Sequence, residues 1–61
     1  GREDFIGDIA IADGDVSSKG SVKLRGASWK ARTSQVIAVK DGEKCKVVKI
    51  SGVVLEVESI D

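Results

Sequence analysis

The sequence predicts an all-β domain, a small five-stranded barrel, and three observations point to it. Nine Val and six Ile dominate the 41% of the chain that is hydrophobic, whereas Leu occurs twice. β-Branched side chains favour a pleated sheet over a helix. Seven Gly fall between alternating apolar runs, where tight turns need them, and Pro is absent. A chain of 61 residues holds one core, so a single domain over 1–61 is predicted.

The first half of the chain predicts one strand followed by a hairpin. Residues 5–12 form the first strand, with Gly7, Ile9 and Ile11 on one face and Ile6, Ala10 and Ala12 on the other. An Asp-Gly-Asp turn ends this strand, and residues 16–19 make an irregular connection.

Residues 21–25 and 27–33 are then predicted to form a tight hairpin that turns at Gly26. Val22 and Leu24 face inward in its first strand, and Ala27, Trp29 and Ala31 share one face of its second. Four basic residues alternate with the inward-facing residues of the two strands, so we expect them to point outward and to share one surface. They are Lys23, Arg25, Lys30 and Arg32.

The second half predicts a loop and a second hairpin. Residues 34–43 form a loop with one partly buried turn, closed by Asp41-Gly42. Strands over 44–50 and 53–58 flank a two-residue connection, Ser51-Gly52. The parity of apolar residues changes within 44–50, which predicts a bulge between Val47 and Val48. In the last strand, Val53, Leu55 and Val57 are predicted to point inward, and Glu56 and Glu58 outward.

Five short antiparallel strands without a helix predict an OB-type barrel, with an SH3-like barrel as the alternative. Closing the sheet removes the exposed edges that a Val-rich chain would otherwise present to other chains.

The residues do not assemble a catalytic or metal-binding pattern. One Cys and no His exclude an internal disulfide, the usual zinc ligand sets and a Ser-His pair. Cys45 alternates with Val47 and is expected to be a buried small apolar residue, and Glu56 and Glu58 are interpreted as a solvated strand face. We therefore predict a domain that is not an enzyme, with no catalytic residue, no cofactor and no metal.

Charge is segregated along the chain although ten basic and ten acidic residues cancel. Residues 16–40 carry basic side chains and no acidic ones. The four outward cations of the hairpin are therefore the candidate partner-contact face. In OB-folds this face binds oligonucleotides, so single-stranded nucleic-acid binding is the alternative function. Such binders stack bases on aromatic side chains, and this chain has only Phe5 and Trp29, with Trp29 assigned to the core side.

The spacing of turn glycines and core residues resembles the C-terminal soluble domain of the NfeD family. Four motifs carry the resemblance. They are an aliphatic residue followed by Gly at the start, a hairpin bounded by two glycines, an aromatic residue two positions before Ala, and a closing hairpin with two glycines. In the same order, the residues are Ile6 and Gly7; Gly20, Val22, Leu24 and Gly26; Trp29 and Ala31; and Gly42, Cys45, Val47, Gly52, Leu55 and Val57. The chain departs from the family where Gly, Pro and Val are common, at Ala10, Ser18 and Cys45.

This resemblance implies a five-stranded OB-type barrel that follows transmembrane helices in a protein working with stomatin-like (SPFH) membrane scaffolds. Residues 1–4 would be the linker from a preceding membrane segment, and the module would lie on the cytoplasmic face of a prokaryotic inner membrane. It would be a non-catalytic interaction or regulatory module that contacts a stomatin-type partner or another copy of itself. Longer members carry a Ser-Lys protease domain resembling Clp proteases, and these residues contain none of it.

Overall fold

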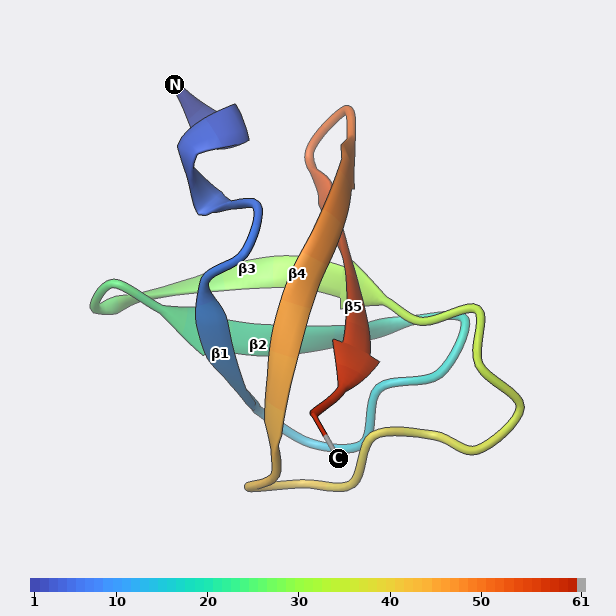
Figure 1. Cartoon of the computed structure of the whole chain (residues 1–61). Helices are drawn as coiled ribbons and strands as arrows, with labels where there is room; N and C mark the ends of the chain where they lie inside the picture. Colours follow the sequence, from blue (N-terminus) through green and yellow to red (C-terminus); the bar gives the residue numbers. More distant parts are fainter. Residues whose placement is uncertain (61) are drawn as a thin grey trace.

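The computed structural model describes residues 1–60 and forms a closed five-stranded barrel (Figure 1). A one-turn 3₁₀ helix precedes the strands, and the elements in chain order are Arg2–Phe5, then β1 (Ile9–Ala12), β2 (Gly20–Leu24), β3 (Ala27–Arg32), β4 (Lys44–Ser51) and β5 (Val54–Ser59). The strands follow each other around the barrel in the order β1-β2-β3-β5-β4, and β4 pairs back with β1. The predicted all-β class and OB-type barrel are confirmed.

One strand pair is parallel, which corrects the expectation of antiparallel strands throughout. β3 and β5 run in the same direction, with Ala31 opposite Leu55 and Arg32 opposite Glu56. The other four pairs are antiparallel. Strand directions cannot alternate all the way around a ring with an odd number of members. A closed barrel of five strands therefore needs at least one parallel pair.

The first strand is shorter than predicted, because residues 5–8 leave the regular extended conformation. Gly7 has a φ of 94°, in the region that glycine favours. The Gly7 amide still donates to the Val47 carbonyl at 2.8 Å, and the Val47 amide donates to the Asp8 carbonyl at 3.0 Å. The segment thus stays attached to β4 while the chain turns so that Phe5 enters the core.

Both hairpin turns differ by one residue from their predicted positions. Arg25 and Gly26 form the β2–β3 turn with φ of 52° and 78°, so Arg25 is a turn residue rather than the last outward residue of a strand. In the second hairpin Ser51 pairs with Val54, and Gly52 and Val53 make the turn. Gly52 has a positive φ and takes the first central position of a two-residue turn, which leaves Val53 exposed rather than inward.

Valine is the most frequent residue of the barrel core. The largest fully buried side chains are Leu55, Val16, Val22, Val39, Val47, Val57 and Cys45. The register between β4 and β5 shifts between Val47 and Lys49, which confirms the predicted bulge. Val39 places one turn of the 34–43 loop in the core, as predicted. Within residues 1–60, no helix has the length and apolarity needed to cross a membrane.

Candidate partner-contact face

The β2–β3 hairpin presents two lysines to solvent on its outer side. Lys23 lies opposite Ser28 and Lys30 lies opposite Ser21, so the two lysines are diagonal neighbours across the strand pair. Both are exposed, and neither forms an ion pair with any residue from 1 to 60. Their charges are therefore available to a partner.

Arg32 shares this outer side but is bound to an acid of the neighbouring strand. Its guanidinium Nη2 lies 3.2 Å from Glu56 Oε1, because Arg32 and Glu56 are directly opposite in the parallel β3–β5 pair. Ser34 Oγ donates to the other carboxylate oxygen at 3.3 Å. Glu56 is therefore an ion-paired residue and not the freely solvated one that its outward parity indicated.

Arg25 is bound to the segment before β1. Its Nε donates to Asp8 Oδ2 at 2.9 Å, and its Nη2 lies 2.8 Å from the same oxygen. The guanidinium carbon also lies 4.7 Å from the centre of the Phe5 ring. Arg25 thus connects the hairpin turn to the segment before β1, and the outer side of the hairpin gathers three of the four predicted cations.

A shallow groove extends this surface toward the β1–β2 connection. Lys19 joins Lys30 and Arg32 along it, and the remaining lining residues are small or apolar: Ser18, Gly20, Ser21, Ala31 and Val54.

Trp29 does not offer a stacking surface on this side. Its indole Nε1 donates to the Leu24 carbonyl at 3.0 Å, and the Phe5 ring meets the indole edge-to-face with centroids 4.9 Å apart. The half-buried Trp29 packs against the core, as predicted. With Phe5 buried as well, neither aromatic residue of the chain lies on the outer side of β2 and β3. Nucleic-acid binding by base stacking has no support in this geometry.

Two exposed isoleucines of β1 are a feature that sequence reasoning missed. Ala10 and Ala12 face the core, so Ile9 and Ile11 face outward. The alternating Ile-Ala-Ile-Ala pattern contained the signal, but periodicity alone does not say which of two apolar faces is inside.

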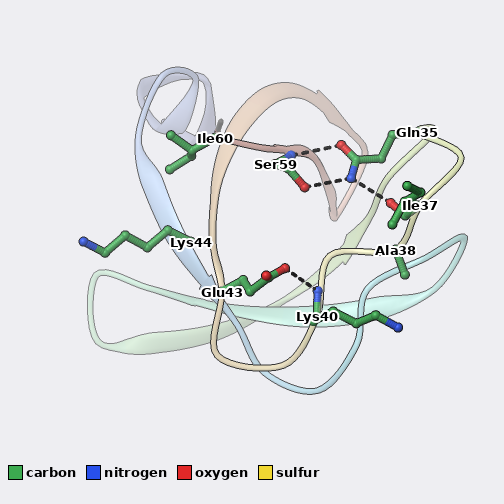
Figure 2. A pocket seen from close by; sticks show the side chains of 8 residues that line it. All are labelled: Gln35, Ile37, Ala38, Lys40, Glu43, Lys44, Ser59 and Ile60. Atoms are coloured by element: carbon green, nitrogen blue, oxygen red, sulfur yellow. Dashed lines mark hydrogen bonds between the residues drawn. The ribbon is translucent and has the colours of Figure 1, made fainter.

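A second groove, also missed, lies between the 33–43 loop and the end of β5 (Figure 2). Gln35 fixes its shape, because Nε2 donates to the Ile37 carbonyl at 2.7 Å and to Ser59 Oγ at 2.8 Å, and Oε1 accepts from the Ser59 amide at 3.0 Å. Glu43 Oε1 accepts from the Lys40 amide at 2.9 Å. These polar groups hold the loop in place.

The single cysteine of the chain lies in the core. Burial raises the pKa of the Cys45 thiol, and its Sγ lies 3.6 Å from the Ala10 carbonyl oxygen. The side chain is fully buried, which confirms the prediction of a buried small residue. No group of three or more metal-ligating side chains occurs in the described part of the chain.

Comparison with known proteins identifies relatives over nearly the whole chain. The family model described as NfeD-like C-terminal, partner-binding domain matches residues 2–58. The membrane-bound protease PH1510 of Pyrococcus horikoshii is 37% identical over 55 residues, which is 90% of this chain but 12% of that protein. The chain thus spans about an eighth of the length of this relative.

Two solved structures share the barrel. The C-terminal domain of stomatin operon partner protein 1510-C from Pyrococcus horikoshii superposes with a TM-score of 0.91 at 34% identity, covering 100% of this chain and 95% of that one. The soluble domain of a Corynebacterium glutamicum membrane protein, implicated in regulation of membrane protease activity, gives a TM-score of 0.90 at 28% identity and covers 97% of each chain.

Proposed function

Because this chain belongs to the family of NfeD-like C-terminal, partner-binding domains, we propose that it is the non-catalytic partner-binding module of a membrane-anchored protein. The partner is a stomatin-type scaffold protein, and the module faces the cytoplasm of a prokaryotic cell. Membrane attachment, and any protease domain, belong to the parent protein outside residues 1–61. The observation that carries the proposal is the match over residues 2–58, supported by the barrel shared with a stomatin operon partner protein.

The contact surface in this proposal includes the outer side of the β2–β3 hairpin. Lys23 and Lys30 supply charges that form no ion pair within residues 1–60, and Arg32 lies beside them with Glu56 as its neighbour. Arg25, the fourth predicted cation, is bound to Asp8 and contributes to holding the turn. Such a surface speeds association with an acidic partner face and orients it.

The test is a binding measurement between the purified chain and the soluble region of a stomatin-type protein from the organism that encodes it. We expect binding that weakens as salt rises, because exposed charges are screened. The double substitution Lys23→Glu and Lys30→Glu should weaken binding by about tenfold through charge repulsion. These two lysines are a cleaner choice than Arg32, whose reversal would also place two carboxylates together at Glu56.

A control is Lys49→Gln, which removes the charge of one exposed lysine on β4 without placing a second carboxylate opposite Glu56. It should leave the affinity unchanged. Absence of binding to the stomatin-type protein at low ionic strength contradicts the proposed partner. Equal binding by the wild-type chain and the double variant contradicts the hairpin contact.

A further inference from the structure

In β1 the small side chains face the core and the large apolar side chains face solvent, which is the reverse of the usual arrangement in a barrel strand. The two small side chains, Ala10 and Ala12, are 0% and 2% exposed, whereas Ile9 and Ile11 remain 47% and 38% exposed. A solvent-facing strand surface is ordinarily polar, because apolar area left in water gives up the free energy of burial. Ile9 and Ile11 thus form an apolar pair on the outer side of β1.

Lysines border this isoleucine pair on both sides. Ile11 lies between Lys23 of β2 and Lys44 of β4, and Ile9 lies beside Lys46 of β4. None of these lysines has an ion-pair partner among the residues that the structure describes. An apolar centre with a polar rim is the organisation of protein–protein interfaces.

We propose that this isoleucine face, formed by Ile9, Ile11, Lys23, Lys44 and Lys46, is the centre of the docking surface for a partner protein. The partner segment carries apolar side chains flanked by carboxylates. The inference rests on the proposed function and names the surface and the partner chemistry for it. Lys23 also belongs to the hairpin side, so the two surfaces are continuous across β2.

Acidic residues near the isoleucine face favour a protein over a lipid surface. Glu58 lies in register with Lys46, and Asp13 directly follows β1. A uniformly anionic membrane repels both carboxylates, whereas a protein can place neutral or basic groups opposite them. β1 is paired on both sides, with β2 and β4, so the partner packs on side chains and does not add a strand.

The test uses the ¹⁵N-labelled chain and two synthetic peptides. In the first, isoleucines are flanked by glutamates, and in the second, lysine replaces every glutamate. We expect the acidic peptide to shift the amide signals of β1 and of the first residues of β4, and the basic peptide to shift none. Amide shifts confined to Lys30 and Arg32, or the absence of shifts, would overturn the proposal.

The informative variant is the double substitution Ile9→Thr and Ile11→Thr, which keeps β-branched side chains in the strand. It should weaken binding of the acidic peptide by tenfold or more, as loss of a central apolar contact does. Val36→Thr is the control, because Val36 is 101% exposed on the 33–43 loop and lies outside the isoleucine face. The second variant, Lys44→Gln with Lys46→Gln, leaves the apolar residues intact and should reduce both the affinity and its salt dependence.

Two further measurements separate this inference from the proposed function. If the stomatin-type protein binds the wild-type chain and the isoleucine variant equally, the isoleucine face is wrong while the proposed partner stands. If that protein does not bind but the acidic peptide still docks on β1, the surface stands and the proposed partner is wrong. Binding to phosphatidylglycerol vesicles that the isoleucine variant abolishes, without binding of the acidic peptide, would assign the face to a membrane instead.

Discussion

Val16 and Val39 exchange two backbone hydrogen bonds although they lie in the two connections that lead into β2 and β4. The Val16 amide donates to the Val39 carbonyl at 2.7 Å, and the Val39 amide donates to the Val16 carbonyl at 2.9 Å. Both side chains are fully buried. The pair fastens the two connections to each other, so neither is a loose loop despite its lack of regular strand structure.

The Val16–Val39 contact predicts that Val39→Ala destabilises the barrel more than its loop position implies. The change removes two methyl groups from a closed site and should lower the free energy of unfolding by about 2 kcal/mol. Urea unfolding followed by Trp29 fluorescence measures it, because Trp29 is half-buried against Phe5. Val36→Ala is the control, since Val36 is fully exposed on the same loop. An equal response of the two variants would contradict a core role for Val39.

The close packing around Gly20, at the start of β2, predicts that a larger side chain there destabilises the fold. A methyl group at Gly20 would lie 2.8 Å from Val16 Cα and 3.0 Å from the Asp15 carbonyl oxygen, and both are backbone atoms that cannot rotate away. Gly20→Ala should therefore lower the free energy of unfolding by about 1–3 kcal/mol through overpacking. The thermal unfolding midpoint reports it, with Ser21→Ala on the next residue as the control. A midpoint unchanged by Gly20→Ala would show that the two segments can move apart without cost.

The burial of Cys45 predicts that the stability of the fold decreases at alkaline pH. Burial raises the pKa of the folded thiol above its usual value of 9.0. Above pH 9.0 the unfolded chain releases this proton while the folded chain retains it. The contribution to stability is therefore complete below that pH and is lost as the pH rises toward the folded pKa.

Cys45→Val removes this linkage and isolates it from the lysines that titrate in the same range. We expect the stability of the wild-type chain to fall more steeply than that of the variant above pH 9.0, and the two slopes to agree at neutral pH. Chemical denaturation across this range measures both slopes. A thiol that reacts with alkylating reagents as fast in the folded chain as in urea would contradict its burial.

The Arg25–Asp8 pair predicts a modest, salt-sensitive contribution from the hairpin turn. The side chains are partly exposed, so the coupling between Arg25→Gln and Asp8→Asn in a double-mutant cycle should be about 0.5–1 kcal/mol. Raising the salt concentration should reduce it. Arg25→Lys keeps the charge but loses the guanidinium fork and should recover only part of the coupling. A coupling of zero at low salt would contradict a contribution of this ion pair and leave the contacts of Arg25 with the Phe5 ring and the Asp4 carbonyl.

The strand content, most strand boundaries to within one residue, and the bulge were correctly predicted from the sequence. Alternation in 21–25 and 53–58 correctly placed Val22, Leu24, Leu55 and Val57 in the core, because strand side chains have a strict period of two. The absence of His and the single Cys exclude an internal disulfide, the usual zinc ligand sets and a Ser-His pair. These are local properties, readable from neighbouring residues and from composition.

The use of the charges and of the apolar faces follows from the tertiary structure. Arg25 and Arg32 were both predicted on the outward side of their strands, yet chain closure brings Asp8 to one and Glu56 to the other, and leaves Lys23 and Lys30 without an ion-pair partner among residues 1–60. In the same way β1 has two apolar faces, and the closed barrel buries its alanines and leaves Ile9 and Ile11 outside. The physical reason is that ion pairing and packing join residues distant in the chain. Their outcome depends on which strands become neighbours, and the local pattern does not contain that information.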